Sequence, residues 1–197
     1  RYENVDTGAP YVVVDIDTQP LVPVVGPSFK SDIAWAPIPL DIKLIQEWEA
    51  GERIQQDRHV LVLAMKNGAP YRVYGLWHAW LDDVLGGWRA TAYAVYDCTQ
   101  GDGQRPYQWT GADVMGTGML QGMVRADELI SGTINHAIRW TQAQQSKEGI
   151  WPATHHVFYS QGANGIPVGL RMRLKASFDR VTAPNSQPWH PYARAML

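Results

Sequence analysis

The chain of 197 residues, 45% of them hydrophobic and 18% charged, can fill one core but is short for two full-sized domains. Its formal net charge of -2 provides no broad basic surface, which argues against a nucleic-acid partner. The sequence also lacks the run of about 20 apolar residues that a membrane-spanning helix needs, and its single cysteine, Cys98, cannot form a disulfide within the chain.

The first 56 residues are rich in proline, and we expect them to wrap around a core formed by residues 57–197 of the same domain. Proline cannot donate a hydrogen bond to a neighbouring strand. We therefore expect edge strands or extended wraps at Tyr11–Val14, Leu21–Val25 and Ala36–Leu40. Because the chain begins with Arg1 and stops at Leu197, where another helix could start, we expect a longer natural protein that continues past this C-terminus.

Residues 41–97 have one helical pattern followed by a three-stranded antiparallel pattern. Asp41–Ala50 has an apolar stripe, a capping residue at its start and a glycine after its end. Two alternating runs, His59–Met65 and Pro70–Trp80, flank the turn Asn67-Gly68, which is typical of a β-hairpin. Trp88–Asp97 then predicts the third strand.

The stretch Gly111–Trp140 combines five glycines with ionisable side chains more densely than an ordinary helix or strand requires. We expect it to line a site or to close the end of a sheet. Within it, Ala126–Ser131 predicts a short helix that begins near Arg125 and ends at Gly132. Thr133–Thr141 fits a strand or a helix, and its alternation of Ile, His and Trp with other residues favours a strand.

The remainder reads as a polar loop at 142–148, an extended segment at 150–160, a turn at 161–167 and a strand at 168–178 with a basic outer face. Closely spaced strands, few helices and connections rich in proline and glycine are typical of all-β folds. We predict a mainly β fold: an antiparallel, two-sheet β-sandwich of the jelly-roll type with one or two short helices.

Candidate catalytic residues come from histidine and aspartate positions, because the familiar nucleotide-binding, serine-nucleophile and zinc-protease motifs are absent. Imidazole and carboxylate groups can act as general acid and base in polysaccharide hydrolysis or elimination. The candidates are Asp57, His59, Asp113, His136 and His155. A structural role is the alternative for each, as in a turn stabilised by an ion pair or a strand histidine bonded inside the protein.

Further residues could recognise a substrate or a metal. Arg58, Arg125 and Arg171 would bind anionic groups of a polysaccharide. Trp77, Trp109 and Trp151 would stack on sugar rings, with core packing as the alternative. His59, His136 and His155 could instead bind zinc or copper, although their spacing matches no ligand pattern. We predict no cofactor.

Five segments of the chain share their motifs with one protein family. They are Asp57–His59, Met115–Glu128, Asn135–Arg139, Trp151–His155 and Gly169–Asp179. Together they resemble a family of uncharacterised secreted bacterial proteins, over residues 20–197. The resemblance implies export from the cell and a polysaccharide context, without a reaction. This chain departs from the family at Pro70–Val73, where members usually read Leu-Tyr-Glu-Leu.

These observations predict a secreted or cell-surface bacterial protein with a polysaccharide as its partner. The first hypothesis is a polysaccharide hydrolase or lyase that uses His/Asp acid-base chemistry. The alternative is a non-catalytic carbohydrate-binding protein. A third class, a structural subunit of an extracellular filament or envelope layer, is suggested by the proline-rich segment, which could add a strand to a neighbour. The substrate and the oligomeric state stay open.

Overall fold

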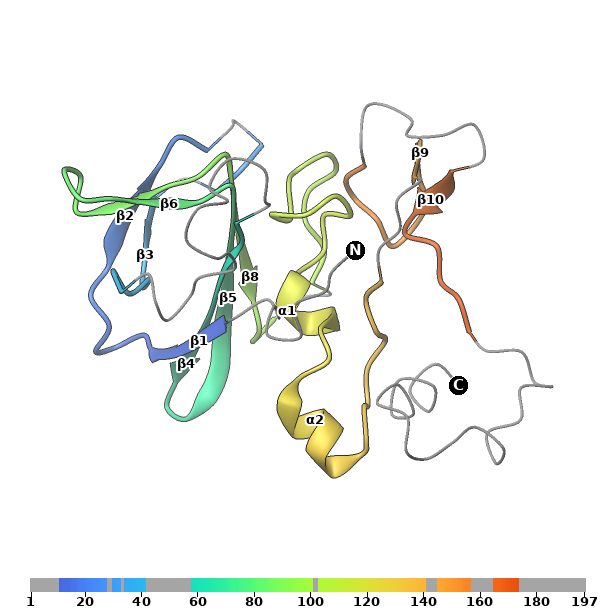
Figure 1. Ribbon diagram of the computed structural model, residues 1–197, viewed down its shortest axis with the longest axis horizontal. Helices are drawn as coiled ribbons and strands as arrows, with labels where there is room; N and C mark the ends of the chain where they lie inside the picture. Colours follow the sequence, from blue (N-terminus) through green and yellow to red (C-terminus); the bar gives the residue numbers. More distant parts are fainter. Residues whose placement is uncertain are drawn as a thin grey trace, which may run out of the picture.

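The computed structural model describes residues 11–27, 30–32, 34–41, 58–100, 103–140, 145–156 and 165–173. Over these ranges the chain forms ten strands and two short helices, so the predicted mainly β class is confirmed. The first eight strands gather in one body, the helices lie beside it, and the last two strands form a small separate sheet (Figure 1). Neither described helix is long and apolar enough to cross a membrane.

One four-stranded sheet is built on the predicted hairpin. Its strand order is β1 (Tyr11–Asp15), β4 (Val60–Lys66), β5 (Ala69–Trp77) and β8 (Ala92–Asp97). Asn67 and Gly68 turn the chain between β4 and β5 with φ values of 51° and 77°, as a two-residue hairpin requires. β5 and β8 are also antiparallel, whereas β1 is parallel to β4. The sheet is therefore mixed, and the prediction of a purely antiparallel fold is wrong.

The second four-stranded sheet contains the other two described strands of the proline-rich segment. Its order is β3 (Ala34–Ala36), β2 (Val22–Val25), β7 (Gly87–Arg89) and β6 (Trp80–Asp82). β1 lies at the edge of its sheet, as predicted for Tyr11–Val14, whereas the edge strand β3 shares only Ala36 with the predicted segment Ala36–Leu40. β2 lies inside the sheet and pairs with β7 in parallel, so the edge position predicted for Leu21–Val25 is wrong. Pro23 is tolerated in this inner strand because the pairing of β2 with β7 begins one residue later, at Val24. A side chain at Gly87 would clash with the Pro23 carbonyl, so glycine permits the close approach.

Two strands predicted as single runs divide between the two sheets. The first run leaves one sheet at Trp77, and His78, with φ of 49°, directs it into β6 of the other sheet. The second run forms β7 and then, after a break, β8. The break between β5 and β6 lies beside the break between β7 and β8, and the Thr91 N–H donates to the Trp77 carbonyl there (3.1 Å). An uninterrupted apolar alternation cannot reveal such breaks, because it continues through both sheets.

Side chains from both sheets meet in one buried cluster. Its members include Val14, Val22, Val24, Ala36, Ile38, Val60, Val62, Leu76 and Trp88. The indole N–H of the largest member, Trp88, donates to the Pro39 carbonyl (3.3 Å), so this 1% exposed ring keeps its polar group paired. A second cluster joins strands β5 and β8 to the segment that follows them: Val73, Ala94, Tyr96, Ala112 and Leu120. That contact anchors the glycine-rich stretch on the sheet.

The short helix predicted inside the glycine-rich stretch is confirmed. Helix α2 (Ala126–Ser131) begins after Arg125, and Gly132 ends it in the left-handed conformation with φ of 70°. A single-turn helix, α1 (Met119–Gly122), precedes it and was not predicted. The strand predicted at Thr133–Thr141 is wrong, because residues 133–140 pair with no strand. Instead the Arg139 N–H donates to the Gly122 carbonyl at the end of α1 (2.8 Å).

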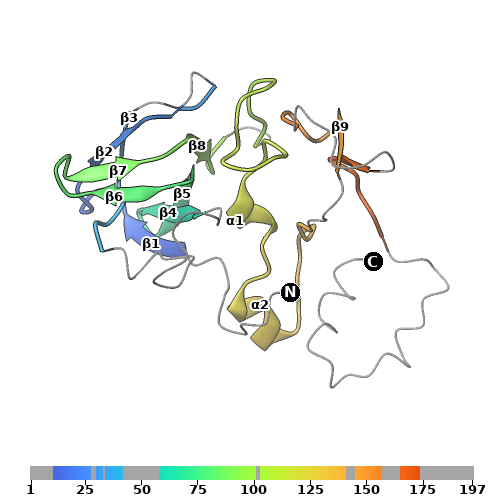
Figure 2. The same ribbon diagram turned by 45° about the horizontal axis from the view of Figure 1, so that its top comes forward.

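The C-terminal described residues form a two-stranded parallel sheet (Figure 2). Its strands, β9 (Gln145–Gly149) and β10 (Ile166–Val168), lie where a loop and a turn were predicted. The strand predicted at 168–178 is wrong over residues 169–173, since Gly169, with φ of 93°, turns the chain out of β10. Residues 174–178 and the helix predicted after Asp41 lie outside the described ranges.

Candidate functional site

Two of the predicted catalytic histidines hold the glycine-rich loop at residues 111–118. His59 donates from Nε2 to the Ala112 carbonyl (3.1 Å), and His155 donates from Nδ1 to the Val114 carbonyl (3.0 Å). His59 is 8% exposed, so its bond lies inside the protein. A ring N–H that donates to a backbone carbonyl fixes the tautomer and the orientation of the imidazole. Both histidines therefore support the backbone of this loop.

The segment before His155 lies directly against the same loop. The N–H groups of Thr154 and His155 both donate to the Met115 carbonyl (3.1 and 3.3 Å), and the Thr154 hydroxyl donates to the Gly116 carbonyl (3.3 Å). Gly116 has φ of 74°, and a Cβ there would collide with Thr154 and His155. Glycine is thus required at this position for two reasons: the left-handed backbone and the close approach.

Asp113 lies in the middle of the loop with its side chain only 2% exposed. Its Oδ1 accepts the Gly116 N–H (2.7 Å), which closes a tight turn. Its Oδ2 lies 2.7 Å from Nη1 of Arg139, whose side chain is 24% exposed. The two groups are not aligned for a hydrogen bond, so the contact is an ion pair. A buried carboxylate needs such a partner. Here the partner, Arg139, belongs to residues 133–140, where a strand was predicted and none forms.

A second polar cluster surrounds Glu128 at the start of α2. Its Oε2 accepts the Arg125 backbone N–H (2.9 Å), and its Oε1 lies 2.6 Å from Arg125 Nη2 and 2.9 Å from His136 Nε2. Burial favours a higher pKa for Glu128, but these hydrogen bonds and neighbouring positive charges outweigh it, so the pKa is lowered. His136 also donates from Nδ1 to the Ala137 carbonyl (2.9 Å). Both ring nitrogens of His136 thus lie next to acceptor oxygens.

The structure brings together only part of the predicted acid-base set. His59, Asp113 and His155 all belong to the loop at 111–118 or contact it, whereas His136 contacts Glu128 instead. Asp57 lies outside the described residues. Across the described part of the chain, no group of three or more His, Cys, Asp or Glu side chains could hold a metal ion, so the three histidines of the zinc or copper alternative do not form one.

Of the predicted substrate-binding residues, Trp151 and Arg171 are the most accessible pair. The Trp151 ring is 70% exposed, and the guanidinium carbon of Arg171 lies 4.3 Å from its centroid. The other predicted residues contact nearby side chains. These contacts are Arg58 with Trp80 (5.5 Å), Trp109 with Arg105 (5.5 Å), Trp77 stacked on His78 (3.9 Å) and Arg125 with Glu128 (2.6 Å).

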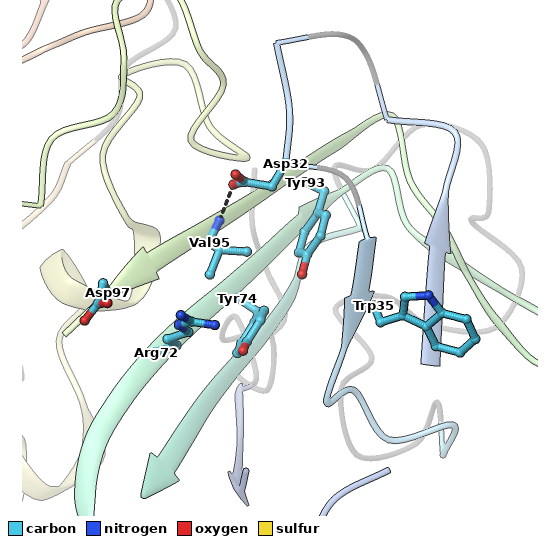
Figure 3. A pocket seen from close by; sticks show the side chains of 7 residues that line it. All are labelled: Asp32, Trp35, Arg72, Tyr74, Tyr93, Val95 and Asp97. Atoms are coloured by element: carbon cyan, nitrogen blue, oxygen red, sulfur yellow. Dashed lines mark hydrogen bonds between the residues drawn. The ribbon is translucent and has the colours of Figure 1, made fainter. Parts of the chain in front are cut away.

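An open pocket of about 350 Å³ lies on the main β body and contains none of the predicted site residues. Its lining includes Tyr74 from β5, Tyr93 from β8 and Trp35 from β3, and the Trp35 indole points away from the other side chains (Figure 3). The charged side chains of the lining are Asp32, Arg72 and Asp97. Aromatic walls with a few polar groups are typical of small-ligand sites.

Asp32 is fixed at the edge of this pocket by a buried cation. Its Oδ2 accepts the Val95 N–H (2.7 Å) and Nη1 of Arg105 (2.5 Å). Arg105 is 6% exposed and also donates to the Val95 carbonyl (3.1 Å). The Asp32 side chain is 30% exposed, and both of these bonds are made by one of its two oxygens. The carboxylate therefore keeps a fixed position with Oδ1 available for another donor.

The opposite side of the pocket is formed by β5 and β8, whose register places Arg72 across from Asp97. Arg72 hydrogen-bonds the Tyr74 hydroxyl, but burial has the larger effect and raises the pKa of Tyr74. Hydrogen bonds from the Thr99 hydroxyl and backbone amide lower the pKa of Asp97. At neutral pH the pocket thus presents a phenol that can donate and a carboxylate that can accept.

Part of this pocket has a signal in the sequence. Arg72 and Tyr74 alternate in a predicted hairpin strand, so they share one face of the sheet. The third predicted strand would place Asp97 beside them once the register is known. Asp32 and Trp35 have no such signal, because they come from the proline-rich segment. Asp32 reaches β8 through its N–H, which donates to the Tyr93 carbonyl (2.9 Å), and Trp35 belongs to β3 of the other sheet.

The fold and the pocket define a mainly β protein with an open site of aromatic and charged side chains. Comparisons with family models, curated proteins and solved structures give no significant match to the chain. The resemblance to secreted bacterial proteins therefore stays a prediction.

Proposed function

We propose that this protein binds an extracellular polysaccharide without cleaving it. The observation that supports the proposal is the exposure of at least four of the nine tryptophans. Large aromatic side chains are highly buried on average. Here the exposed fractions are 70% for Trp151, 60% for Trp35, 42% for Trp80 and 40% for Trp140. An indole with an apolar face and a polar edge suits a sugar ring, which has both kinds of surface.

The contacts of the predicted acid-base residues support binding over catalysis. A general base must reach the proton that it removes from the substrate. His59 and His155 instead donate to loop carbonyls, and Asp113 is buried against Arg139. These groups maintain the shape of the loop, and the aromatic residues would make the contacts with the ligand.

Secretion or cell-surface location belongs to the same proposal, as does the jelly-roll arrangement, which is common in lectin domains. In this proposal the two sheets serve as a rigid support for the exposed rings. Rigid aromatic side chains provide contact area at low cost in conformational entropy.

The proposal is tested by incubating the protein with a panel of soluble and insoluble polysaccharides. We expect retention on at least one of them, and a chain length that is unchanged after prolonged incubation when measured by size-exclusion chromatography. A Trp35→Ala/Trp151→Ala double variant should bind less, whereas Val84→Ala, which changes a fully exposed aliphatic residue, should bind as the parent does. Retention on none of the panel would contradict the proposal.

A second candidate is a polysaccharide hydrolase or lyase, which the contact between Glu128 and His136 favours. A carboxylate beside an imidazole whose side chain is 23% exposed could exchange a proton with a bound substrate. Shortened chains or unsaturated products formed by the parent, and lost in Glu128→Gln, would support this candidate. Ser131→Ala in the same helix is the control, and no product from the parent on any polysaccharide removes the candidate.

A further inference from the structure

We propose that the outer face of the sheet β3-β2-β7-β6 binds an acidic polysaccharide, with Trp35 and Trp80 as two platforms for its sugar rings. The outer face is the side of this sheet opposite the buried cluster that joins it to the other four-stranded sheet. This inference rests on the proposed function and adds the place of binding and the class of ligand.

The strand register determines which side chains share the outer face. Successive side chains of a strand point to opposite faces of the sheet, and directly paired residues of adjacent strands point to the same face. Ala36, Leu81 and Trp88 belong to the buried cluster or pack against it, so their neighbours in these strands point outward. The outer face therefore carries Pro23, Val25, Trp35, Trp80, Asp82, Gly87 and Arg89.

Trp35 and Trp80 lie at opposite edges of the outer face. Trp35, on β3, is 60% exposed, and its indole points away from the side chains of the pocket (Figure 3). Trp80, on β6, is 42% exposed. The sheet order places β2 and β7 between them. Adjacent strands are about 4.8 Å apart, so the two tryptophan backbones lie roughly 15 Å apart. One sugar ring cannot reach both indoles, whereas an extended chain of several rings can.

The centre of the outer face carries small side chains between the two indoles. Gly87 has no side chain, and a Cβ there would collide with the carbonyl and the ring of Pro23. Pro23 and Val25 are half-buried in β2. The surface between the tryptophans is thus apolar and lower than the rings that flank it. A contiguous exposed apolar surface with polar groups at its rim is typical of a binding site.

The accessible charge beside Trp80 is positive. Arg89 pairs with Trp80 in the strand register, and its side chain is 47% exposed. The guanidinium carbon of Arg58 lies 5.5 Å from the centroid of the Trp80 ring. Asp82 is only 17% exposed and both of its oxygens are bonded, Oδ1 to the Leu85 N–H (2.9 Å) and Oδ2 to Nε of Arg89. Two guanidinium groups beside one bonded carboxylate favour an anionic ligand, and arginine binds carboxylates such as those of uronic acids well.

A second copy of the chain is the other partner that an exposed sheet face could take. In a symmetric dimer the same surface meets itself. Such a dimer would bury Arg58 and Arg89 of both copies without a new carboxylate to neutralise them, because Asp82 is already bonded. An acidic polysaccharide supplies the missing negative charge, so charge complementarity favours it over a second copy.

The inference is tested by isothermal titration calorimetry of the whole protein with two sets of oligosaccharides of increasing length. The acidic set comes from polygalacturonate and alginate, and the neutral set from cellulose, xylan and mannan. The test variants are Trp35→Ala, Trp80→Ala and Arg89→Gln. Matched controls are Tyr107→Ala, which removes a 74% exposed ring outside the outer face, and Lys66→Gln, which removes an exposed positive charge from β4 of the other sheet.

The expected result is binding of an acidic oligosaccharide that becomes tighter as the chain grows long enough to reach both tryptophans. Each test variant should weaken this binding by about tenfold or more, as removal of a central aromatic or charged contact does. The controls should keep the parental affinity, and unfolding in urea should confirm that every variant is folded.

Four results would count against the inference. Acidic binding that all three test variants retain would overturn the site and leave the proposed function standing. Preference for the neutral set would overturn the ligand class. A dimer in light scattering that Trp35→Ala dissociates would assign the outer face to a second copy and overturn the inference. No binding to either set or to polysaccharides would overturn both proposals.

Discussion

Replacement of Asp113 by alanine should destabilise the protein strongly, because this carboxylate organises the loop at 111–118. Its Oδ1 accepts the Gly116 N–H and its Oδ2 pairs with Arg139. The substitution removes both contacts at once from a side chain that is 2% exposed. A role in stability is thus the first consequence of the geometry, whatever the substrate.

The size of the effect follows from the groups that lose their partner. Removing one member of a buried ion pair costs about 3–5 kcal/mol, and a buried N–H left unpaired costs about 1–3 kcal/mol. Arg139 is 24% exposed, so water can solvate part of its guanidinium in the variant. This solvation reduces the ion-pair cost to about 2 kcal/mol, so that with about 1 kcal/mol for the Gly116 N–H the total loss is about 3 kcal/mol. Asp113→Asn keeps an acceptor for the Gly116 N–H and should lose only about 1–2 kcal/mol.

Urea unfolding followed by tryptophan fluorescence measures this difference. With an m-value of about 2 kcal/mol/M, a loss of about 3 kcal/mol lowers the midpoint by about 1.5 M. The matched control is Asp127→Ala, since Asp127 also pairs with an arginine (3.5 Å) but is 72% exposed. The control should change the stability by less than about 0.5 kcal/mol. A midpoint for Asp113→Ala equal to that of the control would refute this account of the loop.

Three further substitutions test neighbouring contacts by the same unfolding measurement. Gly116→Ala should cost about 2 kcal/mol or more, because the new Cβ adds a collision to the strain of a positive φ. Gly68→Ala has the same strain but open space around the Cβ, and should cost about 1 kcal/mol. Equal losses for the two variants would contradict the close approach at Gly116. Tyr96→Phe removes a hydroxyl that donates to the Gly111 carbonyl (3.2 Å) and should cost about 1 kcal/mol. The lowered pKa of Glu128 means that its contribution is complete above the ordinary value of 4.5 and is lost as the pH falls through the folded-state pKa. The advantage of the parent over Glu128→Gln should therefore shrink below pH 4.5, and a constant difference from pH 7 to pH 3 would contradict the assignment.

Local signals in the sequence predict the local structures. The Asn67-Gly68 corner fixes the hairpin because both residues tolerate a positive φ, and Gly132 ends α2 for the same reason. The strand predicted at Thr133–Thr141 fails because alternation alone supplies no partner strand, and its backbone bonds to α1 and α2 instead. The mixed sheets were not predictable either, since parallel pairs join segments that are distant in the chain.

The same distinction applies to the candidate site. The sequence singled out the stretch Gly111–Trp140 and the histidines His59 and His155, which contact the loop at 111–118. It could not tell a supporting role from a catalytic one, because the difference depends on which atoms the imidazoles meet. The pocket was missed because Asp32 comes from the proline-rich segment and meets Tyr93 and Val95 of β8, more than 60 residues later in the chain. Ligand sites assembled across two sheets need coordinates before their members can be recognised.

The most direct test of the proposed function is to follow the indole N–H signals of the nine tryptophans by NMR while a soluble fragment of a retained polysaccharide is added. Binding through exposed rings predicts that the signal of Trp35 or Trp151 shifts in a saturable manner while the signal of Trp88, 1% exposed and bonded to Pro39, stays constant. The absence of a saturable shift in any exposed tryptophan signal would contradict it.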